Sequence, residues 1–240
     1  MVTLAAALAG STTVAVAQQT AAQERAFRFG VTAGANISTA FVTNATGSTV
    51  KPGWQAGLAF DYAFSQKFLL QWELSFIDKG AKVKGFLISD YDGDGGEGNW
   101  TDRIDQQYVE LSLAATKRVK LSPGWDLIWG AGPYFAYGVG GKDRHKLING
   151  VYGDYSTERT YKTFETTYFT YTDYLGEVFA MPEEANLRRF DWGLGLRVGV
   201  EHRRVSLTLG LDQGLTNIAV DRNDLTYINT SLSLSAGYKL

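Results

Sequence analysis

The closing stretch Ser231-Leu-Ser-Leu-Ser-Ala-Gly-Tyr-Lys-Leu240 decides the fold. Its apolar side chains alternate one by one with small or polar ones, so they fall on two separate sets of positions: Leu232, Leu234, Ala236, Tyr238 and Leu240 against Ser231, Ser233, Ser235, Gly237 and Lys239. Successive side chains of a β-strand point to opposite faces. The stretch therefore predicts a strand with one apolar face and one small, polar face.

Seven earlier segments repeat this period of two. They cover residues 27–38, 54–64, 70–76, 108–116, 125–139, 192–201 and 205–212. The segment 125–139 has the weakest pattern, because Ile128 and Tyr134 fall on its polar face. Together with the closing stretch, the pattern predicts an all-β chain of eight strands.

The polar faces of these strands distinguish between two kinds of all-β protein. They are rich in Gly, Ser and Thr and carry scattered charges of both signs, which suits the crowded interior of a narrow barrel. A soluble sandwich or lipocalin-like barrel also alternates, but its exposed face is usually rich in charge, and it is the alternative here. No apolar run reaches the roughly 18 residues of a spanning helix, so a membrane could be crossed only by a closed barrel.

The connections between the strands alternate strictly in length. Short ones cover 65–67, 119–124 and 202–204, and long ones cover 39–51, 85–103, 141–188 and 219–225. Tight turns at one end and long loops at the other are typical of outer-membrane barrels. We therefore expect an eight-stranded antiparallel up-and-down transmembrane β-barrel with long outer loops, and both chain ends in the periplasm.

Aromatic residues gather where these strands meet the connections, as in the two interfacial girdles of membrane barrels. We expect one girdle at the short-turn end, from Phe27, Phe64, Phe68, Trp125 and Tyr238. We expect the other at the long-loop end, from Trp54, Phe76, Tyr137, Trp192 and Tyr227.

The N-terminus has the character of an export signal. Residues 4–17 are small and apolar, and Ala15-Val-Ala17 has the form of a cleavage site, although no basic residue precedes them. We predict a signal peptide at 1–17, a short lead at 18–26 and the barrel at 27–240, in the bacterial outer membrane. A disordered Ala/Thr-rich tail is the alternative for the first segment.

Composition excludes several classes of function. The net charge of −2 gives no electrostatic reason to expect nucleic acid as a partner. The absence of cysteine excludes a disulfide framework, a thiolate nucleophile and a cysteine-ligated metal.

Several motifs in order along the chain resemble the outer-membrane β-barrel family of Bacteroidetes, sometimes called PorT-like. They lie at residues 29–38, at Lys51-Pro-Gly-Trp-Gln-Ala-Gly57, and at 71–76 followed by Lys79-Gly80. They continue at 108–111, at Gly130-Ala-Gly-Pro-Tyr134 and at 214–218. The resemblance implies a small eight-stranded barrel similar to the enterobacterial X protein (OmpX-like), and it implies no single activity. The chain departs from the family in its long 141–188 segment and in ending on Leu240.

Charged residues on the predicted inner faces must be paired if they are buried. The predicted polar network of the lumen consists of Arg28, Asp61, Glu73, Glu110, Arg197, Glu201 and Asp212, to which Lys79, Arg118, Asp126 and Lys239 can add. Mixed signs favour internal ion pairs that fill the lumen, and conduction of protons or ions is the alternative. An eight-stranded barrel is just wide enough for side chains to fill.

The segment Asp90-Tyr-Asp-Gly-Asp-Gly95 resembles the start of a calcium-binding loop, with oxygen ligands on alternate residues and a glycine for the turn. The candidate ligands are Asp90, Asp92, Asp94, Glu97 and Asp102; Thr101 stands where such a loop places its last glutamate. An acidic loop without metal is the alternative, and we expect no other cofactor.

The long segment 141–188 carries the residues most typical of recognition surfaces, namely Tyr152, Tyr155, Tyr161, Tyr168, Tyr171 and Tyr174. They predict contact with a protein or a glycan, or else they pack together to order a long hairpin. His145, with Asp143 nearby, gives weak support for a lipid-modifying enzyme. The sequence favours a non-enzymatic outer-membrane barrel with a sealed lumen and interacting loops, with outer-membrane lipid around it. An accessory of transport or secretion is the alternative.

Overall fold

The computed structural model describes residues 27–43, 45–65, 67–89, 96–149, 155–165, 167–172, 178–183, 187–220 and 225–240. The predicted signal peptide and lead, residues 1–26, lie outside these ranges. The described residues include no helix that is long and apolar enough to cross a membrane.

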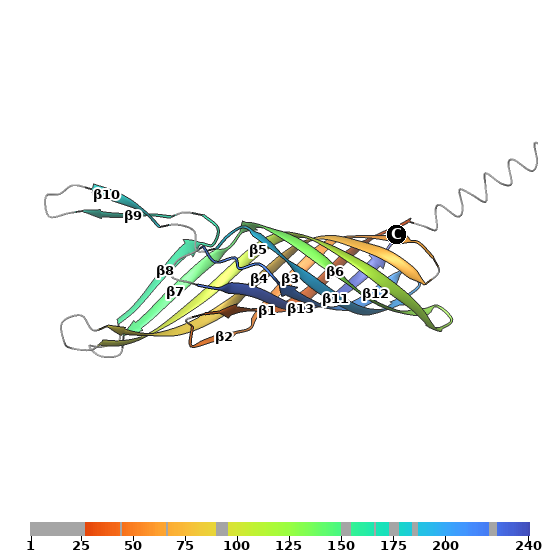
Figure 1. Ribbon diagram of the computed structural model, residues 1–240, viewed down its shortest axis with the longest axis horizontal. Coiled ribbons are helices and arrows are strands. Elements are labelled where there is room, and N and C mark those ends of the chain that lie inside the picture. Colours follow the sequence, from red (N-terminus) through yellow and green to blue (C-terminus); the bar gives the residue numbers. More distant parts are fainter. Residues whose placement is uncertain are drawn as a thin grey trace, which may run out of the picture.

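Eight antiparallel strands form a closed ring (Figure 1). In chain order they are β1 (Phe27–Val42), β3 (Lys51–Ala63), β4 (Phe68–Ser89), β5 (Gly96–Ser122), β6 (Trp125–Gly140), β11 (Phe190–His202), β12 (Val205–Gly214) and β13 (Tyr227–Lys239). Each strand pairs with its neighbours in the ring, and pairing of β1 with β13 and of β4 with β5 completes it. The predicted fold class is confirmed.

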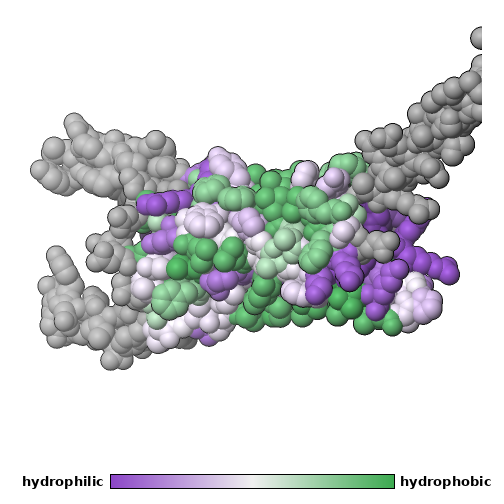
Figure 2. Space-filling view, turned by 45° about the vertical axis from the view of Figure 1, so that its right-hand side comes forward, coloured by the Kyte–Doolittle hydropathy of each residue, from purple (hydrophilic) through white to green (hydrophobic). Residues whose placement is uncertain are grey.

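The exterior of the ring is apolar because the strand register places the apolar side chains of neighbouring strands beside one another on the same face. Leu209 of β12, for example, lies opposite Val198 of β11 and Leu234 of β13, and all three side chains are exposed. On the face that Figure 2 shows, hydrophobic residues gather in the middle of the molecule, and hydrophilic residues lie mostly toward the ends. An exposed apolar surface of this extent is stable only against lipid or another apolar partner.

The interior is packed with the small and polar sides of the same strands. Ser231, Ser233 and Ser235 of β13 are buried there. Ile128 and Tyr134, which weaken the pattern of β6, also point inward, and the ring of Tyr134 is only 1% exposed. These two residues fill space inside the barrel, so the weak alternation of this strand reflects packing and not a break in the fold.

Several of the predicted connections are largely strand. The hairpin of β4 and β5 is paired from Phe68 opposite Lys117 to Ser89 opposite Gly96, so most of 85–103 extends the barrel wall. The connection 119–124 shrinks to a turn at Pro123 and Gly124, because β5 runs on to Ser122. In the 39–51 connection, the short strand β2 (Gly47–Thr49) pairs with β4.

Beyond the ring, the chain builds what we call the extension sheet at the long-loop end (Figure 1). It consists of β2, the distal parts of β4 and β5, β7 (Lys142–Asn149) and β8 (Tyr155–Lys162). Gly141 has a φ of 145° and a Cβ there would lie 2.1 Å from the Asp105 carbonyl oxygen, so glycine permits the bend that carries β7 onto β5. A separate hairpin follows, made of β9 (Thr167–Thr172) and β10 (Val178–Glu183).

The aromatic girdles follow the prediction with one exception. The five residues expected at the short-turn end are all exposed on the exterior, as are Trp54, Tyr137 and Trp192 at the other end. Phe76 is half-buried and stacks on Trp54. The assignment of Tyr227 was wrong: its side chain is 2% exposed, because it shares the inward-facing side of β13 with Asn229 and Ser231.

Candidate functional site

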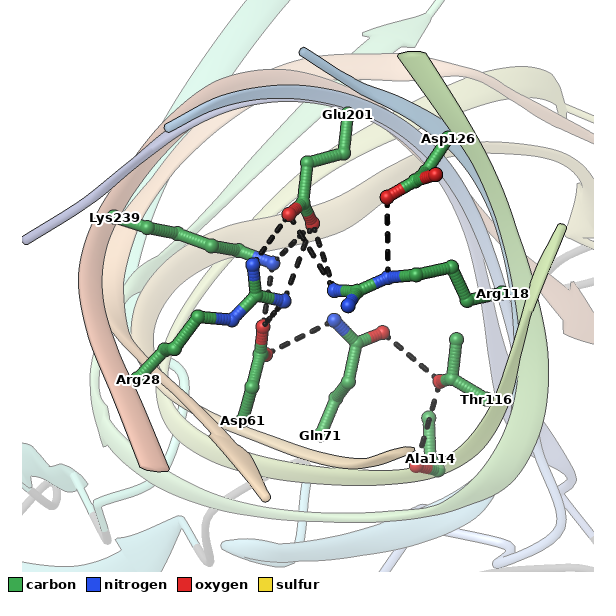
Figure 3. Close-up of polar contacts among 9 residues, drawn as sticks. All are labelled: Arg28, Asp61, Gln71, Ala114, Thr116, Arg118, Asp126, Glu201 and Lys239. Atoms are coloured by element: carbon green, nitrogen blue, oxygen red, sulfur yellow. Dashed lines mark hydrogen bonds and ion pairs between the residues drawn. The ribbon is translucent and has the colours of Figure 1, made fainter. Parts of the chain in front are cut away.

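The lumen at the short-turn end is crossed by a network of ion pairs centred on Glu201 and Asp61 (Figure 3). Arg28 donates to Glu201 at 2.5 Å and to Asp61 at 2.9 Å. Lys239 Nζ lies 2.5 Å from an oxygen of each carboxylate. Each carboxylate is 3% exposed, so the two cations replace much of the water that it would otherwise bind.

The network extends across the barrel to the opposite wall. Arg118 lies 3.4 Å from Glu201 and 3.5 Å from Asp126, and Gln71 donates to Asp61 at 3.0 Å. The side chains come from β1, β3, β4, β5, β6, β11 and β13, and they converge on the centre of the ring (Figure 3). Three cations face three carboxylates, so the charges balance and polar groups fill the cross-section.

A second set of ion pairs lies nearer the middle of the barrel. Arg197 donates to Asp212 at 2.7 Å, and Lys79 donates to Glu110 at 2.5 Å. Glu73 accepts from Thr32 at 2.7 Å. A Cβ at Gly195 or Gly210 would lie 3.0 or 3.1 Å from Arg197 Nη1, so these glycines leave room for the guanidinium.

The lumen between the two sets keeps a polar cavity of about 70 Å³. Its lining includes Gln55, Glu73, Arg197, Ser233 and Ser235. A cavity of this size holds only a few water molecules. Side chains therefore occupy most of the interior, as expected for eight strands.

At the long-loop end, apolar side chains close the mouth of the ring. Phe164, from the turn after β8, packs at 5.4 Å between ring centroids on Tyr108 and against Gly138, inside the barrel wall. The other loop residues in this buried cluster are Leu187, Ile218 and Ala219. Thr163 fixes the turn by donating from its hydroxyl to the Asp105 carbonyl oxygen at 2.8 Å. We call these five residues, 163, 164, 187, 218 and 219, the mouth plug.

All seven residues predicted for the polar network face the lumen, in two separate groups. Sequence reasoning missed Asp191, which accepts from Asn229 at 3.0 Å and from Tyr134 at 3.4 Å. Asp191 lies two residues before Gly193, on the polar side of β11, and this position in the alternation indicates that it faces the lumen. Sequence reasoning also missed Lys51, a buried cation 2.8 Å from Asp78 and 3.2 Å from Asp105, which lies at the end of a predicted loop.

The calcium prediction falls mostly outside the described residues. Asp90, Asp92 and Asp94 lie there, as does the side chain of Glu97. Asp102 is in β5, six residues from the start of that strand and so about 20 Å along it. It pairs with His145 of β7, and burial raises the pKa of the Asp102 carboxyl. Within the described ranges no group of three or more acidic or histidine side chains could hold a metal ion.

The tyrosines of the long segment are only partly described. Tyr161 lies in β8 opposite Asp143 and is half-buried. Tyr152 and Tyr174 lie outside the described residues, and for Tyr155, Tyr168 and Tyr171 only the backbone, in β8 and β9, is described. Their role as contact residues stays a prediction.

A closed antiparallel ring with an apolar exterior and ion pairs across its interior defines an integral β-barrel of the bacterial outer membrane. The chain belongs to the family described as outer membrane protein beta-barrel domain, whose model matches residues 16–220. A comparison with curated proteins finds no match.

Solved structures of outer-membrane barrels are similar to the chain at low identity. The attachment invasion locus protein Ail of Yersinia pestis, in complex with the heparin analogue sucrose octasulfate, is 12% identical, with 89% of this chain and 99% of that chain covered and a TM-score of 0.37. Neisserial surface protein A is 12% identical, with 88% and 97% covered and a TM-score of 0.36. OprG of Pseudomonas aeruginosa is 11% identical, with 90% and 96% covered and a TM-score of 0.38.

Proposed function

We propose that the protein is a non-enzymatic surface barrel whose lumen is sealed and whose long-loop end binds a protein or a glycan outside the cell. In this orientation the short turns and both chain ends are periplasmic. The motifs at 29–38 and 130–134 support a place among the PorT-like barrels of Bacteroidetes.

The observation that carries the proposal is the extension sheet. The β4–β5 hairpin is paired up to Ser89 and Gly96, and β7 and β8 add two more strands beside β5. Such a sheet presents ordered backbone and side chains beyond the membrane, which flexible loops do not. In the part of the chain that the structure describes, no strand pairs with the edge of β8 that lies away from β7, an arrangement that suits the addition of a strand from a partner.

The packed lumen supports the same assignment by leaving little room for transport. The ion pairs around Glu201 fill the ring at one end, and the mouth plug fills it at the other. A role as an accessory of transport or secretion would then also act through the outer surface.

Removal of residues 142–188 tests the proposal. Wild-type and truncated barrels are placed in nanodiscs and exposed to a glycan array and to outer-membrane extract of the source bacterium. We expect at least one ligand to be retained by the wild-type chain and lost by the truncated one. Both proteins should keep the heat-modifiable gel migration of a folded barrel, since the ring strands remain.

A second deletion, of 167–183 alone, removes the β9–β10 hairpin but keeps the extension sheet and the mouth plug. It assigns the binding surface to the hairpin or to the sheet. If every ligand that the wild-type chain retains is also retained by the 142–188 deletion, the proposal is wrong.

A further inference from the structure

One face of the extension sheet is strongly basic. It continues the exterior of the ring, because β4 and β5 stay paired without a register shift from the lipid-facing belt to the hairpin end. The basic face consists of Lys82, Lys84, Arg103, Lys142, Arg144 and Lys146. The opposite face of the same strands carries buried Ala81, Val83 and Ile104.

The register places these cations directly against one another. Lys82 lies opposite Arg103, and Arg103 lies opposite Arg144, so three cations form a row across three strands. Like charges in directly opposite positions destabilise a sheet. The chain as a whole has a net charge of −2, so this gathering is not a consequence of composition.

Acidic residues neutralise part of this face. Asp78 and Asp105 line the same hollow as Arg103 and Arg144. Glu158 of β8 lies opposite Lys146 in the strand register. Arg103 lies 3.5 Å from Asp105, which also pairs with Lys51. Among the side chains that the structure describes, no carboxylate lies within ion-pair distance of Lys82, Lys84, Lys142 or Arg144. The row therefore leaves a surplus of positive charge for an anionic partner.

The spacing of the face suits a ligand with several phosphate groups. Strands lie about 4.8 Å apart, and residues i and i+2 about 6.7 Å apart along a strand, so the row spans about 10 Å. Arg103 and Arg144 can each grip a phosphate with two parallel hydrogen bonds, and lysines add point charges. One headgroup with two phosphates could contact several cations at once.

The position of the face identifies the source of the phosphate. Phe76 is the last apolar residue on the outer side of β4 before Lys82, which follows six residues later, about 20 Å along a tilted strand. Thr49, which pairs with Lys82, is followed by the exposed apolar Val50. The basic face thus borders the lipid-facing surface. We propose that it binds the phosphorylated headgroups of outer-leaflet lipid.

This inference uses the orientation proposed above, in which the long-loop end lies outside, but it does not depend on a surface partner. The test compares wild-type protein with Lys82→Gln/Arg103→Gln/Arg144→Gln. A matched control is Lys67→Gln/Lys120→Gln/Arg204→Gln, which removes three exposed cations at the short-turn end. Each is refolded into phosphatidylcholine vesicles that contain diphosphorylated lipid A, and the folded state is verified by heat-modifiable migration.

The protein is then extracted in mild detergent and purified, and the lipid A retained per protein is measured by mass spectrometry. Each cation near an anionic surface contributes roughly fivefold in affinity, so we expect the row variant to retain at least about tenfold less lipid A. The control variant should retain as much lipid A as the wild type. None of the three proteins should retain dephosphorylated lipid A. High salt should reduce the retention by wild type.

Three results would overturn the inference. The first is equal retention by the row variant and the wild type, and the second is equal retention of the dephosphorylated lipid. The third is that the lipid-free protein in detergent binds inorganic polyphosphate as tightly as it binds lipid A. This result would indicate that the natural ligand is a soluble polyanion. If the row variant does not fold, Lys84→Gln/Lys142→Gln/Lys146→Gln tests the same face. Failure here leaves the glycan or protein binding of the 142–188 segment untouched.

Discussion

Glu201→Ala should destabilise the folded barrel by about 3 kcal/mol, because it leaves buried cations without their main partner. Glu201 contacts Arg28, Arg118 and Lys239 in the lumen. We take the lower end of the range for a broken buried pair, since Arg28 is 26% exposed and water screens part of its charge. Urea unfolding of the protein in vesicles, followed by tryptophan fluorescence, measures the change.

Two further variants test whether the loss comes from unbalanced buried charge. Glu201→Ala/Lys239→Met removes one anion and one cation, and leaves Arg28 with Asp61 and Arg118 with Asp126. It should recover most of the lost stability. Glu165→Ala removes an exposed carboxylate beside Lys162 and should not change the unfolding midpoint measurably. If the double variant is as unstable as the single one, the network does not act through charge balance.

Leu209→Arg should cost about 2–4 kcal/mol, because it places a charge on the lipid-facing side of β12 near the middle of the strand. Leu209 is 50% exposed and lies between Val198 and Leu234. The cost should depend on bilayer thickness, since thickness sets the depth of the charge. The same urea measurement in vesicles of two acyl-chain lengths tests this.

The neighbouring residue provides the matched comparison. Thr208 faces the lumen and lines the polar cavity, so Thr208→Arg should act through crowding. Its effect on stability should not change with bilayer thickness. Equal insensitivity to thickness at both positions would count against a membrane barrel.

The alternation of side chains predicted the ring but not the way its distal part is built. Leu232, Leu234 and their counterparts identify the strands because lipid and lumen impose opposite requirements on neighbouring positions. Beyond the membrane this requirement ends, and the 85–103 segment gives no such pattern although most of it is strand. The pairing of β7 with β5 depends on the bend at Gly141, which a pattern in one segment cannot reveal.

The sequence predicted which charged residues face the lumen, but it did not predict which of them pair with one another. The alternation of side chains along each strand is enough to place Asp61 and Glu201 in the lumen. It does not show that both pair with Arg28, because they lie 33 and 173 residues away from it in the sequence. Tyr227 was assigned to the exterior because aromatic residues favour the interface, although its parity with Ser231 placed it inside. The basic face of the extension sheet could not be found from the sequence, since the strand register alone aligns Lys82, Arg103 and Arg144.

Ion conductance across a planar bilayer tests most directly whether the barrel is closed and therefore acts through its outer surface. The wild-type protein is refolded, its heat-modifiable monomer is isolated, and a wide porin in the same bilayers serves as the positive control. We expect no steps above the bare bilayer, because the network around Glu201 and the mouth plug each cross the lumen. Stable, ohmic steps that appear with the folded wild-type monomer would contradict the account.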